Sequence, residues 1–343
     1  MTDNNTSDRV RLSATEARAL GEAAMRGAGY SDDDARIITD HVIDAALCGY
    51  EYSGLPKLLN VVDSPKFQLP QRPMTVLRDS GATALLDGGN QVGMVTAYHA
   101  AKMTIARGQA HGLAVVSLAN TWTTGRSAYF CGMIARAGLV VMHSVAIEPG
   151  VAPFGGARPA LGTNPIAFGF PTEGEPLVID IGTSAFMASN LQYRARVGLP
   201  IPEGVALGPE GRPTTDAGEA LLGTLLPFGG PEAGYKGFGL ALAMDALGAL
   251  TAGARPAGAL DGHVFIAIKP DAFLPLDDYR REISQRMATI KATPRQAGVD
   301  EIRIPGERSH QTRERLLREG IEIDRKIQTS LNRLAEGHLD HGG

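Results

Sequence analysis

The chain has few cysteines: Cys48 and Cys131 are the only two in 343 residues. Two thiols are too few for a disulfide framework, and no residues at metal-ligand spacing surround them. We therefore interpret both as small buried apolar residues, and we expect no metal site. So few cysteines are typical of a protein in a reducing compartment, and we expect a cytoplasmic location.

The sequence also lacks an excess of charge of one sign and long apolar runs. The formal net charge is −4, so nothing favours nucleic acid or an anionic membrane surface as a partner. The first ten residues, MTDNNTSDRV, are polar and contain no apolar signal core. No apolar run approaches the roughly 18 residues that a membrane span needs, so we expect a soluble protein without a membrane partner.

The glycine fingerprint of a Rossmann domain is absent as well. No G-x-G-x-x-G follows a strand-like run, and no Walker A sequence occurs. Gly237-Phe238-Gly239 comes nearest, but the third glycine is missing and no strand precedes it. The sequence therefore does not support a standard Rossmann domain.

What the sequence does contain is an alternation of strand-like and helical segments. Leu113 to Leu118 is predicted as a buried strand, followed by a polar turn from Asn120 to Gly125. A helix from Ser127 to Ala137 then leads to a second strand, Leu139 to Ser144. This order indicates an α/β protein, and the length suits one large domain or two to three smaller ones.

Helices are predicted near both ends of the chain. Ser13 and Glu16 form a capping box for the first helix, and Ser31 caps the second. Near the C-terminus, Asp324 caps a last helix, in which Ile327 points inward.

The stretch from Val151 to Ser184 is the most informative part of the chain. It contains two short apolar runs, Ile166 to Phe170 and Leu177 to Ile181, which are bounded by turn residues and are predicted as buried strands. Small hydroxyls, an amide and bare backbone N–H groups stand at the strand ends, where open α/β sheets bind ligands. A plain hairpin with glycine-rich turns is the alternative interpretation.

A second candidate site is the segment Tyr235-Lys236-Gly237-Phe238-Gly239, which precedes a long apolar helix predicted from Leu240 to Leu250. Glycines and a lysine at a helix N-terminus would form an anion site, because free N–H groups and the helix dipole favour phosphate. The alternative is a tight junction that needs glycine only for packing.

Taken together, several long motifs resemble the type 2 malate/L-lactate dehydrogenase family, whose relatives include ureidoglycolate dehydrogenase and Δ1-piperideine-2-carboxylate reductase. They follow the family's order and spacing from about residue 10 to residue 335. The motifs are VAPFGG (Val151–Gly156), LGTNPIAF (Leu161–Phe168), D-x-x-T-S (Asp180, Thr183, Ser184), IPEG (Ile201–Gly204), LLPFGG to YKGFGLAL (Leu225–Leu242) and IPGE (Ile304–Glu307).

This resemblance implies an α/β, non-Rossmann NAD(P)-binding fold with a mixed sheet and flanking helices. It also implies a homodimer with the active site near the subunit boundary. We expect a disordered tail over residues 1–9, a helical substrate domain over 10–118 and 280–337, an NAD(P)H-binding domain over 119–279, and a tail over 338–343.

The resemblance further implies which residues contact NADH or NADPH. Lys236 is expected at a phosphate or a ribose, and the region of Arg308 at a further phosphate. The expected cofactor contacts are Thr123, Thr124, Gly125, Arg126, Ser127, Asp180, Ile181, Gly182, Thr183, Tyr235, Lys236, Pro305, Gly306, Glu307, Arg308 and Ser309, with the last segment extending to Gln311.

For a small carboxylate substrate, the resemblance implies contacts with Thr163 and Lys57. Lys57 stands where the family has an arginine for the substrate carboxylate, and lysine keeps the charge but loses the bidentate fork. The family pattern Asp-Ser-His-Gly is replaced here by residues 51–54, so Ser53 stands at the position of a proton-donating histidine and Tyr52 beside it. The second family histidine corresponds to Thr123, and Asn190 lies near a family Lys or Asp.

These replacements leave three hypotheses open. The first is reduction of a cyclic imino acid, such as Δ1-piperideine-2-carboxylate or Δ1-pyrroline-2-carboxylate, because an iminium carries its own proton. The second is a 2-oxo acid or 2-hydroxy acid dehydrogenase of the malate or lactate type in which Tyr52 is the acid. The third is a divergent member with a non-redox or binding role.

Overall fold

The computed structural model describes residues 8–256, 259 and 261–340. Its strands are β1 (Arg9–Leu12), β2 (Thr75–Asp79), β3 (Thr83–Val92), β4 (Leu113–Trp122), β5 (Val140–Ala146), β6 (Ile166–Phe170), β7 (Leu177–Ile181), β8 (Ala206–Leu207), β9 (Thr224–Leu225), β10 (Gly262–Ile268) and β11 (Ile321–Asp324). Its α-helices are α1 (Ala14–Gly27), α2 (Asp32–Leu47), α3 (Pro56–Val62), α4 (Gly93–His111), α5 (Ser127–Arg136), α6 (Ala188–Val197), α7 (Ala217–Leu222), α8 (Gly230–Gly248), α9 (Leu276–Lys291), α10 (Glu307–Glu319) and α11 (Arg325–Ala335).

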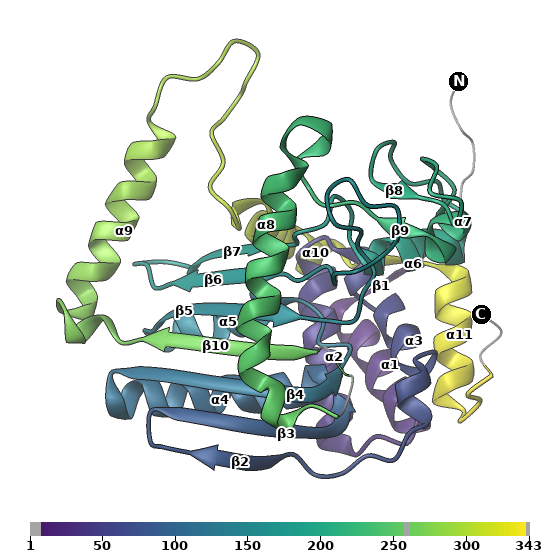
Figure 1. Cartoon of the computed structure of the whole chain (residues 1–343), viewed down its shortest axis with the longest axis horizontal. Coiled ribbons are helices and arrows are strands. Elements are labelled where there is room, and N and C mark those ends of the chain that lie inside the picture. The colour runs from purple at the N-terminus through teal and green to yellow at the C-terminus, as the bar shows by residue number, and fades with distance from the viewer. Residues whose placement is uncertain (1–7, 257–258, 260, 341–343) are drawn as a thin grey trace.

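A seven-stranded sheet forms the centre of the molecule (Figure 1), with the strand order β2-β3-β4-β10-β5-β6-β7. β3 and β4 run parallel and are joined through α4, whereas the other neighbouring strands are antiparallel. The predicted mixed sheet with flanking helices is therefore confirmed. β6 and β7 have the predicted bounds, because turn residues stop the chain on both sides of each strand.

Helices cover both faces of this sheet. α4 and α5 lie behind the strands in Figure 1, and α8 crosses in front of them. The core between the sheet and the rear helices is apolar: Leu118, Phe130 and Phe265 are fully buried there. Burial of a side chain of this size contributes about 1.5–3 kcal/mol, so this layer holds the strand ends in place.

A second core lies among the helices from the two ends of the chain. α1, α2, α3 and α11 pack around it, and β1 pairs with β11 to join the termini of this unit. The capping box at Ser13 and Glu16 is present, and Ile327 is buried as predicted.

The predicted domain boundary between residues 118 and 119 needs correction, because it falls inside β4. β2, β3 and β4 belong to the central sheet, so the helical unit ends before residue 75. Residues 1–7 and 341–343 of the two predicted tails lie outside the described residues, and Arg9 already begins β1. The hydrophobic alternation of β3 and β4 could be recognised in the sequence, but their neighbour β10 is far away along the chain.

The predicted start of the long apolar helix at Leu240 was wrong. α8 begins at Gly230, so Lys236 lies in its second turn and not at its N-terminus. Glycines occur within this helix because the chain passes close to it: a Cβ on Gly237 would lie 2.5 Å from the carbonyl oxygen of Phe228. The anion site predicted from free N–H groups around Lys236 is therefore not formed.

Two apolar surfaces remain uncovered. Among the described residues, the window from Gly230 to Ala254 is long and apolar enough to cross a membrane, but only 33% of it is buried and the helices of soluble cores meet the same criterion. α8 packs on the sheet with one side; Leu242 of α8 and Leu250, in the 3-10 turn that follows the helix, are more than half exposed. α9 has no buried residue and stands away from the body of the molecule in Figure 1.

Candidate functional site

Two clefts meet at the turn that follows β4. The first, which we call the Lys57 cleft, has a volume of about 930 Å³ and is lined among others by Lys57, Trp122, Thr123, Thr163, Ser189 and His263. The second, which we call the arginine cleft, has a volume of about 520 Å³ and is lined among others by Asp44, Tyr50, Arg126, Asp180, Arg308 and Arg313. The turn from Thr123 to Ser127 contributes to both, so one extended ligand can reach from one cleft to the other.

The turn between the clefts is held by a buried histidine. The backbone N–H of Arg126 donates to Nε2 of His41 at 2.8 Å, so Nε2 is the unprotonated nitrogen of the ring. Burial lowers the pKa of His41 to about 3, with further contributions from the charges of Arg126 and Lys57, so the ring is neutral and able to accept. Thr123 has a φ of 52°, which is unusual for a β-branched residue and typical of functional sites.

Glycine is required at position 125 of the same turn. Gly125 has a φ of 80°, and a Cβ there would lie 2.2 Å from Nε2 of His41. His41 therefore sets the shape of the turn by direct contact as well as by its hydrogen bond.

Lys57 is the cation at the base of its cleft. It comes from α3, and its Nζ donates to Oγ of Ser189 at the start of α6 at 2.7 Å. Part of the side chain is accessible from the cleft, yet protein atoms surround the ammonium, and this desolvation lowers the pKa of Lys57 to about 8. Within the part of the chain that the structure describes, no carboxylate pairs with Lys57, so its charge is available to an anionic ligand.

A hydroxyl and two histidines form a chain that leads from the Lys57 cleft into the sheet. Oγ1 of Thr124 lies 3.1 Å from Nε2 of His263, and Nδ1 of His263 lies 3.3 Å from Nε2 of His143. Burial lowers the pKa of His263 to about 4 and holds the pKa of His143 well below its usual value, so both rings are neutral near pH 7. His143 stacks on Phe265 inside the sheet and is a core histidine.

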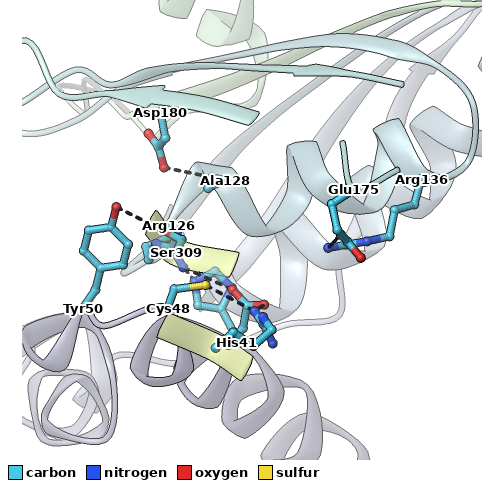
Figure 2. A network of polar contacts seen from close by, with 11 residues as sticks. His41, Cys48, Tyr50, Arg126, Ala128, Arg136, Glu175, Asp180 and Ser309 are labelled. Atoms are coloured by element: carbon cyan, nitrogen blue, oxygen red, sulfur yellow. Dashed lines mark hydrogen bonds and ion pairs between the residues drawn. The ribbon is translucent and has the colours of Figure 1, made fainter. Parts of the chain in front are cut away.

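Polar contacts of the arginine cleft link α2, the turn, β7 and α10 (Figure 2). Arg126 pairs with Asp44 at 3.1 Å and lies 4.4 Å from the ring centroid of Tyr50, while Arg313 also pairs with Asp44. Asp180 accepts the backbone N–H of Ala128 at 2.8 Å, as Figure 2 shows. The clustering of arginine side chains makes this cleft suitable for phosphate groups.

Arg308 differs from the other arginines of this cleft. It lies in the first turn of α10, where the positive end of the helix dipole favours an anion. No ion pair or hydrogen bond to its side chain occurs among the described residues, whereas Arg126 and Arg313 are both held by Asp44. Arg308 is thus free to bind a ligand phosphate.

Most of the predicted ligand contacts lie in these clefts. Lys57, Thr163, Thr123, Thr124, Gly125 and Ser127 line the Lys57 cleft. Arg126, Asp180, Ile181, Pro305, Gly306, Arg308 and Ser309 line the arginine cleft. Residues predicted from five separate segments therefore converge on one continuous site.

The remaining predicted residues line neither cleft. Thr183 is buried and donates to the carbonyl of Thr163, Gly182 lies beside it, and Glu307 pairs with Lys291. Lys236 and Tyr235 lie on the exposed side of α8. The three predicted catalytic residues, Tyr52, Ser53 and Asn190, are likewise absent from the residues that line the two clefts.

Sequence reasoning missed Ser189, His263 and His41. Ser189 meets Lys57 across 132 positions of the chain, and no local pattern indicates that contact. His263 lies in a predicted strand that seemed ordinary, and His41 lies on the inner side of a predicted helix. Only the tertiary packing brings these side chains to the turn.

The residues present fit a nicotinamide dinucleotide. Free Arg308, the start of α10 and the other arginines suit its phosphates, and the shared turn leads from there to the Lys57 cleft.

Comparison with known proteins gives a consistent picture. Residues 12–332 match the family model described as Malate/L-lactate dehydrogenase. The Malate/(S)-sulfolactate dehydrogenase of Methanothermus fervidus is 31% identical over 338 residues, which cover 95% of this chain and 97% of that protein. A dehydrogenase from Sinorhizobium meliloti has a similar structure, with a TM-score of 0.86, 28% identity and coverage of 96% and 99% of the two chains.

The Δ1-piperideine-2-carboxylate reductase from Pseudomonas syringae also shares the fold. Its structure has a TM-score of 0.79, 24% identity and coverage of 96% of this chain and 99% of that one.

We predict that Arg308→Ala weakens binding of NADH or NADPH by about 1.5–3 kcal/mol, because a charge-assisted contact to phosphate is lost. Isothermal calorimetry measures the change. The matched control is Arg281→Ala, which removes an exposed arginine of α9 that already pairs with Asp278. Equal affinities for the wild type and Arg308→Ala would exclude a phosphate contact at this residue.

Proposed function

The chain belongs to the malate/L-lactate dehydrogenase family and is an oxidoreductase, and on this basis we propose that it reduces a C=N bond next to a carboxylate with NADH or NADPH. The substrate class is a cyclic imino acid such as Δ1-piperideine-2-carboxylate or Δ1-pyrroline-2-carboxylate. The observation that carries this proposal is Lys57, a desolvated cation without a carboxylate partner among the described residues. The histidine that lines the same cleft, His263, is neutral near pH 7 and therefore has no proton to donate as an imidazolium.

Lys57 is suited to hold the substrate carboxylate. Its ammonium is positioned by Ser189, and an anion in the cleft compensates the cost of desolvating the charge. Thr163 lines the same cleft and is fixed through its carbonyl by the buried Thr183. The carboxylate and the neighbouring unsaturated carbon are thereby oriented toward the turn from Thr123 to Ser127.

The bound nicotinamide supplies a hydride to the unsaturated carbon. In an iminium, the electron pair of the C=N bond then stays on a nitrogen that already carries its proton, so no alkoxide forms. A ketone would need a proton donor at that moment. Ser53 and Thr123, which the resemblance puts at the positions of the family histidines, carry only hydroxyls, and His263 is neutral.

A second candidate is reduction of a 2-oxo acid, in which Tyr52 is the acid. The names of the relatives favour it, since the Methanothermus fervidus protein is named for malate and sulfolactate. The surroundings of Tyr52 disfavour it. Its ring packs edge-on against the ring of Tyr50, which lines the arginine cleft, with 6.1 Å between the two ring centroids, and burial raises the pKa of its phenol.

We further propose that the protein is a homodimer. Leu242 of α8 and Leu250 of the 3-10 turn after it are exposed, and α9 carries Leu276, Ile283 and Met287 at helical spacing without burying any of them. A second copy of the chain is the occupant that these surfaces fit, since homo-oligomers are the common solution for such patches.

Leu242→Glu should weaken this association, because a carboxylate would be buried against an apolar partner. Light scattering during gel filtration measures the mass as a function of concentration. We expect twice the chain mass for the wild type and a concentration-dependent decrease for the variant. Leu69→Glu, an exposed apolar residue away from both helices, is the control. A monomeric wild type would refute the dimer.

Imine and ketone reduction are separated by steady-state kinetics on matched substrates. We expect Δ1-piperideine-2-carboxylate to be reduced faster than a 2-oxo acid of the same size, with little effect of Tyr52→Phe. The rate should fall as pH rises, because the imine loses its proton. The imine proposal fails if the oxo acid is the better substrate and Tyr52→Phe lowers its rate about a hundredfold, the usual effect of removing a general acid.

The role of Lys57 predicts a pH dependence of carboxylate binding. A lysine with a pKa of about 8 loses its charge as pH rises through that value, so binding should weaken above pH 8 and be constant below it. The inhibition constant of pyrrole-2-carboxylate, which stays ionised throughout, should rise roughly tenfold for each pH unit above the pKa. Lys57→Arg keeps its charge and should give a flat profile, whereas a flat wild-type profile would exclude Lys57 as the anchor.

A further inference from the structure

The charges that line the Lys57 cleft are balanced, but they are not equivalent. Three cations, Lys57, Lys66 and Arg196, face the cleft together with three carboxylates, Asp63, Glu148 and Asp261. Arg196 of α6 is held in an ion pair with Asp63 at the end of α3. Lys66 lies 3.7 Å from Glu148. Lys57 is therefore the one cation of this cleft without a carboxylate partner among the described residues.

A second anionic group on a ligand would meet no free cation here. Arg196 and Lys66 are already paired with carboxylates, and the third carboxylate, Asp261, accepts the backbone N–H of Thr121 at 3.4 Å and pairs with no cation among the described residues. His263 beside it is a neutral ring and adds no charge. Once Lys57 has bound one carboxylate, the remaining potential of the cleft is negative.

The rest of the wall suits an uncharged body. Apolar side chains come from three elements and from three connecting segments around the cleft: Trp122, Val145 and Leu221 from the elements, and Ile147, Pro165 and Met187 from the connections. These side chains favour a compact aliphatic ring or chain, and the hydroxyl and amide side chains that also line the cleft bring no positive charge to a second acidic group.

We propose that the Lys57 cleft selects substrates with a single carboxylate and an apolar remainder, and that it rejects dicarboxylates such as malate. The ion pair between Arg196 and Asp63 determines this specificity, because Arg196 is already paired and cannot bind a second carboxylate. This inference rests on the proposed function in one respect, namely that Lys57 holds the substrate carboxylate.

Binding of three matched ligands tests the proposal without requiring turnover. The ligands are pyrrole-2-carboxylate, pyrrole-2,5-dicarboxylate and the 5-carboxamide of pyrrole-2-carboxylate, measured by calorimetry on the full-length protein saturated with oxidised cofactor. The carboxamide has the shape of the second carboxylate but not its charge. We expect the monocarboxylate and the carboxamide to bind at least about tenfold more tightly than the dicarboxylate, because like charges face each other in the last case.

Asp63→Asn tests the ion pair itself, because it releases Arg196. The variant should bind the dicarboxylate about tenfold more tightly than the wild type does, with little change for the monocarboxylate. Glu148→Gln, which releases Lys66, should act in the same direction and replaces Asp63→Asn if that variant does not fold. Glu210→Gln removes an exposed carboxylate outside the cleft and should change neither affinity.

Equal affinity for the monocarboxylate and the dicarboxylate overturns the selection, and weak binding of the carboxamide shows that size and not charge excludes the second group. No gain for the dicarboxylate in either released variant overturns the role of the ion pairs. If Lys57→Ala leaves monocarboxylate binding unchanged, the proposed anchor fails as well, which separates the failure of the proposed function from that of the selectivity alone.

Discussion

An ammonium group held in a cleft without a counter-ion is the constraint on which the site depends. Desolvating a charge is costly, and in a folded protein this cost is usually offset by an ion pair. Among the described residues, the Lys57 ammonium donates to the hydroxyl of Ser189 and pairs with no carboxylate, because two of the three carboxylates of the same cleft, Asp63 and Glu148, pair with Arg196 and Lys66. The charge of Lys57 is thus available to an anionic ligand. The pKa of Lys57 is lowered because its ammonium is desolvated.

The turn after β4 lies between the cleft that contains Lys57 and the cleft that suits a cofactor. It separates the Lys57 cleft from the arginine cleft, and residues of one short segment face both. His41 holds the turn through the N–H of Arg126, and it does so because it is neutral. In the proposed function, a dinucleotide whose phosphates lie at the arginines of the second cleft would extend past Thr123 toward the carboxylate bound by Lys57.

Much of the fold could be predicted from local patterns, and the failures have physical causes. β6 and β7 were found because Pro and Gly bound each apolar run, and the caps at Ser13 and Asp324 identified their helices. The start of α8 was missed because its glycines suggested a loop, whereas they permit close packing against Phe228 and Phe154. The boundary at residue 118 failed because a sheet joins strands that are distant in sequence.

For the site, the resemblance selected Lys57, Thr163 and the turn as ligand contacts, and these residues line one cleft, but it could not show the partners that determine their properties. Ser189, Asp63 and His41 reach the site through tertiary contacts alone. The central claim is that Lys57 binds the substrate carboxylate as an ammonium. Carbon-13 NMR of the lysine side chains, with Lys57→Arg to assign the signal, measures its pKa directly. Our account predicts a pKa of about 8 in the free protein and a clear increase when pyrrole-2-carboxylate binds; a pKa that the ligand leaves unchanged would contradict it.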